Sequence, residues 1–234
     1  MNNVSQPKLE SGGSTQPQTD LGKAILEGAL NDESKDTAVE LAEVGLDTLI
    51  SEGVLKEVPI LKTILAAHKT WTAIHDQLFL RKVASLIQAS PKFTEQDRVS
   101  FTSEHLSDPK KAKRLGDAVV LILDKLDDLA KSAMLAKVFA TLVRGKIDLE
   151  TFRRLAAAID IGFFEDLAAF ATISHPTNDQ MRALYPTLVR TGLTEMKGAA
   201  MPGEGGIRKI TCDVSSLGIT FKKCINDEPY QTEV

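Results

Sequence analysis

The chain has 234 residues, of which 43% are hydrophobic and 5% aromatic, and its formal net charge is −4. This apolar content can bury a core, which excludes global disorder, and the scarcity of aromatic residues favours helices with an aliphatic core over a β-sandwich or barrel. The lack of a basic excess excludes a strong global attraction to nucleic acid and leaves only local basic clusters for such a role.

The N-terminal segment predicts a tail rather than a folded element. Residues 1–19 are rich in Ser, Gln, Gly, Pro and Asn, which cannot bury enough apolar surface to offset the entropy of ordering. They contain no apolar signal sequence, and charges interrupt every apolar stretch before the roughly 20 residues that a transmembrane helix needs. Cys212 and Cys224, without further cysteines, are expected to be reduced thiols. We therefore expect a cytoplasmic protein without stable membrane insertion.

Residues 20–147 predict a helical bundle. Asp20 and Asn31 are suitable N-caps for two helices, the second of which extends to about residue 55. Pro59 then opens one long helix over residues 58–90, which is apolar around much of its circumference and is expected to lie at the centre of the bundle. Further helices are predicted over Thr94–Glu104, Lys110–Leu129 and Ser132–Val143, with a capping box from Thr94 to Asp97 and Gly145 as the last C-cap.

Residues 148–226 predict a small second module, and residues 227–234 a C-terminal tail. Asp148 is expected to cap the helix LETFRRLAAAID, and FFEDLAAFATI predicts another short helix. Residues 178–191 are expected to be helical with a new turn at Pro186, followed by a glycine-rich loop, the strand IRKITCDV and a helix over Ser215–Ile225. The predicted fold class is therefore mainly α, a helical bundle followed by a small α+β module.

The last third of the chain resembles the winged-helix domains of bacterial regulators. The residues that carry the resemblance are Leu188-Val189-x-x-Gly192-Leu193, Arg208-Lys209-Ile210-Thr211 and Ser216-Leu217-Gly218. It implies that the glycine and leucine end a recognition helix, that two strands form a wing, and that the polar-x-Gly step opens the final helix. Two features depart from the family pattern: Pro186 lies inside the implied recognition helix, and the implied wing has a long glycine-rich tip over residues 197–206.

The preceding part resembles a family of uncharacterised helical proteins from bacteria and their prophages. The resemblance lies in the segments LKEVPILKTI, HDQLFLRKVASLI, VLILDKLDDLAKSAMLAKVF and GKIDLETFRRLAAAID. It implies a domain over about residues 38–170 and a bacterial or prophage setting, such as an anti-phage or superinfection-exclusion system. The family has no known activity that the resemblance could transfer to this chain.

No sequence motif predicts a catalytic site or a cofactor. The chain has no GxSxG nucleophile motif and no GxxxxGK[ST] phosphate loop, and the glycines of residues 203–206 lack the strand and helix that flank such a loop. Asp76 could orient the imidazole of His75, but no nucleophile motif is present that would use it. We therefore expect a protein that is not an enzyme.

The sequence offers two weak metal-site candidates. Asp124, Asp127 and Asp128 are spaced to share one helix face and could bind a divalent cation. The interleaved Lys125 and Lys131 instead favour a solvated face of mixed charge. His68 and His75 are two helical turns apart, which is too far for both rings to bind one metal ion. The prediction is that there is no metal site.

Three functions stay open, of which protein binding is preferred. In that interpretation the chain is a protein-interaction or regulatory module with an unidentified protein partner. The first alternative is a DNA-binding regulator that uses residues 178–191 as its reading helix. Its DNA contacts would be Arg182, Arg190, Arg208 and Lys209, and a second basic cluster comprises Lys110, Lys111, Lys113 and Arg114. Residues 176–234 contain seven basic and seven acidic residues, so the module has no basic excess to favour DNA over protein.

The second alternative is a membrane-surface effector. The helix predicted over residues 58–90 could lie in a membrane interface with Trp71 as its anchor. The core of a bundle explains the same apolar residues, because the neighbouring helices need an apolar partner.

Overall fold

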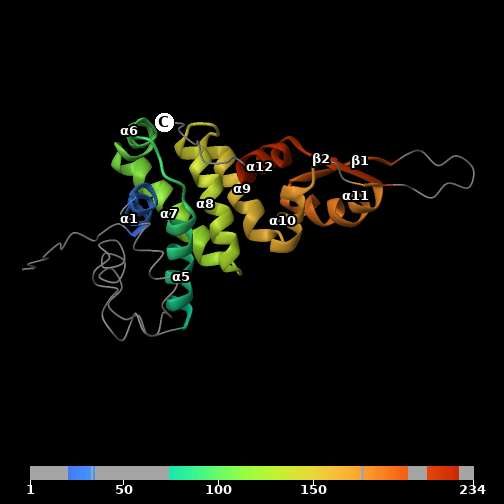
Figure 1. The fold of residues 1–234 in the computed structure, drawn as a ribbon, viewed down its shortest axis with the longest axis horizontal. Helices are drawn as coiled ribbons and strands as arrows, with labels where there is room; N and C mark the ends of the chain where they lie inside the picture. The colour runs from blue at the N-terminus through green and yellow to red at the C-terminus, as the bar shows by residue number, and fades with distance from the viewer. Residues whose placement is uncertain (1–20, 33, 35–73, 175–176, 200–209, 227–234) are drawn as a thin grey trace, which may run out of the picture.

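The computed structural model describes residues 21–32, 34, 74–174, 177–199 and 210–226 (Figure 1). The fold is mainly α, with a two-stranded antiparallel sheet near the C-terminus, which confirms the predicted fold class. In chain order, the elements are α1 (Leu21–Leu30), α5 (Ile74–Ala89), α6 (Glu95–Phe101), the π-helix η2 (Thr102–Leu106), α7 (Pro109–Lys125), α8 (Leu129–Val143), α9 (Leu149–Ile161), α10 (Phe164–Thr172), α11 (Asn178–Leu184), the 3₁₀-helix η3 (Tyr185–Thr191), β1 (Thr194–Ala199), β2 (Ile210–Val214) and α12 (Ser216–Asn226). The two predicted tails, the helix ending near residue 55 and the first half of the 58–90 helix lie outside the described residues.

Helix α8 lies at the centre of the described bundle. Its sequence LAKSAMLAKVFATLV is apolar on nearly every side, and α8 packs against α5, α9 and α12. The described part of the predicted 58–90 helix is α5, whose Leu78 is exposed, so α5 covers α8 from one side rather than forming the centre. Among the described helices none is long and apolar enough to cross a membrane.

The core is mainly aliphatic, as predicted, and its few aromatic residues lie where helices meet. Phe139 of α8 is in edge contact with Phe101 and Phe152, with ring centroids 5.6 and 6.2 Å away. In the C-terminal module Phe170 and Phe221 are in contact at 6.1 Å. All of these rings are buried. Composition counts aromatic residues but does not tell where they lie, so it could not predict this arrangement.

The caps predicted for α6 and α9 are confirmed. Thr94 and Asp97 form the predicted capping box of α6, with hydrogen bonds of 3.1 and 3.0 Å, and Asp148 accepts a hydrogen bond of 2.7 Å from the Thr151 amide at the start of α9. The helix predicted over Lys110–Leu129 is wrong at its end. The backbone leaves the helical conformation at Leu126, and Asp128 caps α8, which therefore begins three residues before the predicted Ser132.

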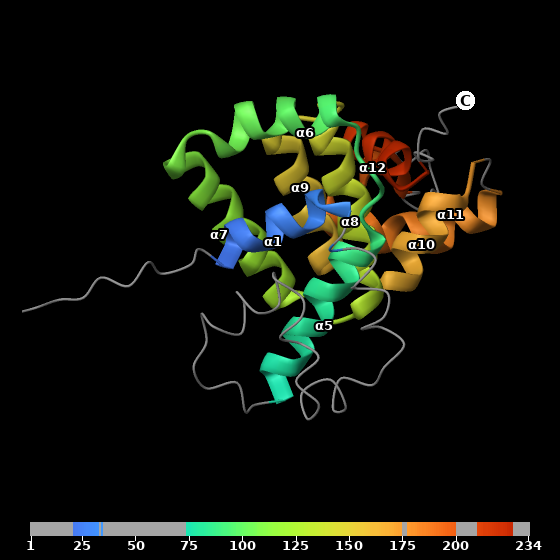
Figure 2. The ribbon, with the colours of Figure 1, turned by 60° about the vertical axis from the view of Figure 1, so that its left-hand side comes forward.

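Helix α1 crosses α7 at a pair of glycines (Figure 2). A Cβ atom added to Gly22 would lie 2.2 Å from a backbone carbon of Gly116, so the two backbones are in direct contact. No larger residue fits at either position without moving one of the helices.

The elements of the C-terminal module that follow α9 lie at the end of the described structure opposite α1 and α6 (Figure 1). As predicted, Pro186 opens a new helical element, η3, which ends at Gly192 with a left-handed φ of 75°. The strands β1 and β2 pair antiparallel from Thr194 and Val214, with a register shift between Lys197 and Ala199. Helix α12 returns to the bundle, where Lys137 of α8 donates to its last turn at the Ile225 carbonyl, 3.1 Å away.

Candidate functional site

The structure describes two of the four residues predicted to contact DNA, Arg182 and Arg190. Arg182 lies 3.9 Å from Asp179 on α11, and Arg190 is exposed on η3. Lys197 of β1 lies 3.6 Å from Glu195 and 3.5 Å from Asp213. Arg208 and Lys209 lie outside the described residues. The described part of the hairpin therefore presents more carboxylates than cations.

The three carboxylates predicted as a possible metal site do not lie on one helix face. Asp124 belongs to α7, whereas the chain has left that helix before Asp127 and Asp128. The Asp128 carboxylate accepts a hydrogen bond of 2.7 Å from the Ala130 amide. Within the described ranges no group of three or more His, Cys, Asp or Glu side chains is placed to hold a metal ion. His68 and the side chain of His75 lie outside them.

A buried lysine at the start of α8 connects two turns of the bundle. Lys131 is only 2% exposed, and its Nζ donates to the Asp160 carbonyl at 3.0 Å and lies 2.6 Å from Asp127 Oδ1. The hydrogen bond from Lys131 holds the pKa of the Asp127 carboxyl below its usual value, although partial burial opposes this effect. Because Asp160 lies in the last turn of α9, the lysine also neutralises the negative end of that helix dipole.

The turn that Lys131 holds in place carries two exposed apolar side chains. Helix α9 ends at Ile161, Gly162 makes the turn, and Phe163 precedes α10. Ile161 is 53% exposed and Phe163 is 74% exposed, the highest value for a large hydrophobic residue in the described structure. A Cβ atom on Gly162 would lie 2.9 Å from the side chain of Leu167, so the turn is tightly packed against α10.

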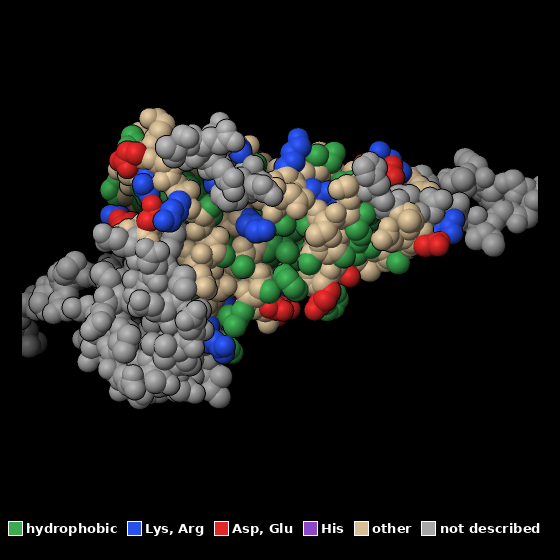
Figure 3. Space-filling view, viewed as in Figure 1, with side chains coloured by type: hydrophobic (Ala, Val, Ile, Leu, Met, Phe, Trp, Pro, Cys, Tyr) green, Lys and Arg blue, Asp and Glu red, His purple; other side chains and the backbone are tan. Residues whose placement is uncertain are grey.

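We define the Phe163 corner as residues 124–131, which connect α7 to α8, together with residues 160–166, which connect α9 to α10. Lys131 joins the two segments through its contacts with Asp127 and Asp160. Figure 3 shows hydrophobic and acidic side chains next to each other along the lower middle of the face that it presents. The corner thus combines exposed apolar side chains with carboxylates on a rigid base, which suits binding and offers no nucleophile with an adjacent base.

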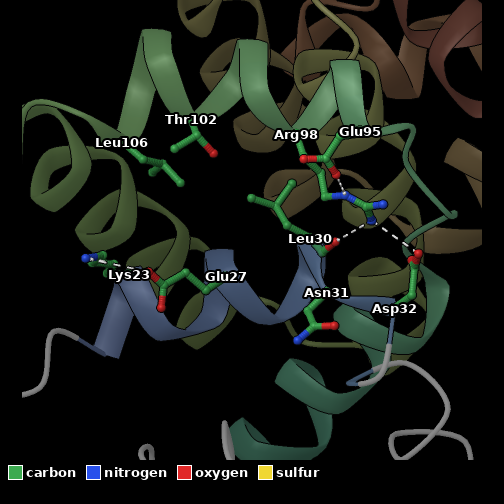
Figure 4. Close-up of a pocket in the computed structure, with 9 residues that line it drawn as sticks. All are labelled: Lys23, Glu27, Leu30, Asn31, Asp32, Glu95, Arg98, Thr102 and Leu106. Carbon is green, nitrogen blue, oxygen red and sulfur yellow. Dashed lines mark hydrogen bonds and ion pairs between the residues drawn. The ribbon is translucent and has the colours of Figure 1, made fainter.

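A second candidate is a groove of about 510 Å³ between α1 and the α6–η2 segment (Figure 4). Its lining residues are Lys23, Glu27, Leu30, Asn31, Asp32, Glu95, Arg98, Thr102 and Leu106. Arg98 donates to Asp32 at 3.2 Å and to the Leu30 carbonyl at 3.4 Å, and it also pairs with Glu95 at 3.5 Å. The hydrogen bond to Asp32 raises the pKa of Arg98 above its ordinary value. The polar groups at this end of the groove already serve to hold α1 on α6, because Arg98 supplies the cation that the last turn of α1 lacks.

No protein-family model matches the chain, and no similar curated protein or solved structure is found. Neither Lys131 nor Phe163 was predicted as a site residue. The function of the chain is therefore inferred from its charged and apolar surfaces.

Proposed function

We propose that the chain is a non-enzymatic protein-binding module and that the Phe163 corner is its docking surface. The observation that carries this proposal is the 74% exposure of Phe163 beside the exposed Ile161. Fully burying one such side chain in an interface contributes roughly 1.5–3 kcal/mol. Exposed apolar residues that stand alone are common on protein surfaces, but two of them on one tight turn form a natural anchor for a partner.

The rigidity of the corner supports this proposal. Lys131 fixes the end of α9 from inside, and Leu167 fills the space beneath Gly162 with no exposed surface of its own. A side chain on a rigid base loses little conformational entropy when a partner covers it, so more of its burial contributes to affinity.

Charge favours protein over DNA as the partner. The cations of the described hairpin and α11 have carboxylates within 4 Å, as Lys197 has Glu195 and Asp213, and such a surface repels phosphate as much as it attracts it. The resemblance to helical bacterial and prophage proteins supports a regulatory or anti-phage setting as part of the proposal. A winged-helix DNA-binding regulator is the alternative.

The test is site-specific photocrosslinking in the host cell. A benzophenone amino acid replaces Phe163 in one variant and, as a control, Val99 in another, because Val99 is also apolar and is 54% exposed on α6. We expect one nuclease-resistant protein adduct from position 163 and none from position 99. Equal adducts from both positions, or adducts only with DNA, would contradict the proposal. Phe163→Ser should also remove the partner from the purified complex, whereas Val99→Ser should not.

A further inference from the structure

We infer that the Phe163 corner recognises a basic segment of its partner, a short stretch in which lysine or arginine side chains flank an apolar one. This inference rests on the proposed function and specifies the chemistry of the partner. It depends on the charges around Phe163 rather than on the exposure of the ring itself.

Carboxylates outnumber cations at the corner. Residues 124–131 and 160–166 contain six carboxylates and two lysines. One of these lysines, Lys131, is buried and offers no charge to a partner. Lys82 of α5 adds a further cation, because its Nζ donates to the Asp124 carbonyl at 2.9 Å. Counting all three lysines, the formal charge is −3, most of the net charge of −4 of the whole chain.

The acidic groups stand beside the apolar ones. Asp127 pairs with Lys131 and is still 70% exposed, so its carboxylate remains accessible to a donor of the partner. Its pKa is below the usual value, so the carboxylate is charged at neutral pH. Glu165 is exposed two residues after Phe163, in the first turn of α10. A partner that places an apolar side chain against Phe163 therefore brings its neighbouring residues close to carboxylates.

The carboxylates around Phe163 favour a positively charged segment of the partner. An acidic segment would place like charges next to each other at the rim of the interface, which costs binding energy, whereas lysine or arginine would find charge-assisted hydrogen bonds. Because these rim groups are largely solvated, the attraction should depend on salt and should affect the association rate most strongly.

The experiment uses the purified full chain and a displayed library of random 12-residue peptides. Peptides are kept if they bind the wild type and do not bind Phe163→Ser, and the charge of the recovered population is the measured quantity. We expect enrichment of lysine and arginine next to apolar residues. For the recovered peptides, Glu165→Lys should weaken binding about tenfold, since it reverses a charge at the rim. Glu104→Lys is the matched control, because Glu104 is 73% exposed on η2 and lies outside the corner.

The outcomes separate the two proposals. Recovery of Phe163-dependent peptides that are neutral or acidic would overturn the basic-partner inference and leave the docking surface standing. Failure to recover any Phe163-dependent peptide would overturn both. Recovered peptides that resemble residues 110–114 of this chain, together with salt-sensitive self-association in sedimentation, would overturn the inference in favour of a second copy as the occupant. Equal weakening by Glu165→Lys and Glu104→Lys would also contradict it.

Discussion

A Cβ atom added to Gly218 would lie 2.0 Å from the carbonyl oxygen of Leu193. Hydrogen bonds tie the same two segments together, because the Ser215 amide donates to Leu193 at 3.0 Å and the Ser215 hydroxyl donates to the Gly192 carbonyl at 2.6 Å. The Ser215 oxygen also accepts from the Gly218 amide at 3.0 Å, so it caps α12. The end of η3 and the start of α12 are therefore one interlocked joint.

Gly218→Ala should destabilise the C-terminal module by about 2–3 kcal/mol, because the atom closest to the added methyl group is a backbone oxygen, which cannot move aside as a flexible side chain could. The free energy of unfolding from urea titration, followed by circular dichroism, measures the effect. Gly145→Ala is the control. Gly145 has a positive φ of 65° but no atom within 4 Å of an added Cβ, so only backbone strain of about 1 kcal/mol is expected there. A larger loss at Gly145 than at Gly218 would contradict this account of the joint.

This joint shows what the sequence can predict. The structure brings Gly192, Leu193 and Gly218 together: Gly192 has a left-handed φ of 75°, and Gly218 leaves no space for a side chain next to Leu193. The helix caps and the new turn at Pro186 could also be predicted, because a cap acts through hydrogen bonds to amides two or three residues away. Such signals are local, so they can be found without knowing the tertiary structure.

Features that depend on distant residues were missed. The break between α7 and α8 could not be predicted from the sequence, because Leu126 and Leu129 continue the helical spacing of apolar residues. Lys131 was interpreted as part of a solvated face, since its partner carbonyl at Asp160 lies 29 residues further along the chain. The exposure of Phe163 likewise depends on how α9 and α10 meet, and a phenylalanine in an apolar segment predicts burial.

Ser132→Ala should stabilise the protein by about 1 kcal/mol. Ser132 has no exposed surface, and within the described structure its Oγ atom is buried without a hydrogen-bond partner. Replacing it with a methyl group removes the desolvation cost of an unsatisfied hydroxyl. Thermal and urea unfolding give the difference from the wild type.

The control for Ser132 is Ser90→Ala. Ser90 is also buried, but its hydroxyl donates to the Leu86 carbonyl at 2.8 Å, so its loss should destabilise the protein by about 1 kcal/mol. Opposite signs for the two serine variants are expected. Destabilisation by both would mean that the Ser132 hydroxyl has a partner after all.

Asp127→Asn should destabilise the protein more than Lys131→Met. The first substitution leaves the buried ammonium group with only the Asp160 carbonyl, whereas the second removes the buried charge and keeps the volume. Because Asp127 is 70% exposed, solvent screening reduces the expected loss to about 1 kcal/mol, and Lys131→Met should change the free energy of unfolding by less. Urea unfolding at neutral pH compares the two.

The same pair predicts a pH dependence. The folded-state pKa of Asp127 is below its ordinary value of 3.8, so its contribution is complete above that pH and is lost as the pH falls through the folded-state pKa. The wild type and Asp127→Asn should therefore begin to converge in stability as the pH falls below 3.8, and should be equal once it is below the lower folded-state pKa, since a protonated aspartic acid resembles asparagine in charge. A gap that persists or widens in acid would show that Asp127 acts through packing instead.

His105 should make the protein less stable as the pH falls below neutrality. The ring is 13% exposed in η2 and packs on Phe101 with centroids 4.9 Å apart. Burial lowers the pKa of His105, and Lys111 lowers it further, whereas Glu104, 3.7 Å from Nε2, opposes them. The folded state therefore prefers the neutral ring. Its contribution to stability is complete above the ordinary pKa of 6.5 and is lost as the pH falls through 6.5 toward the lower folded-state value.

The measurement compares the wild type with His105→Gln by urea unfolding between pH 5 and pH 7.5, because the difference between the two cancels the titration of the other three histidines. We expect the wild type to lose stability relative to the variant on going from pH 7.5 to pH 5. The ring protons in an NMR titration should give the same direction, with a midpoint below 6.5. A difference that does not change with pH would mean that the attraction of Glu104 cancels the effect of burial. A midpoint above 6.5 would mean that this attraction outweighs burial and that η2 accommodates the protonated ring.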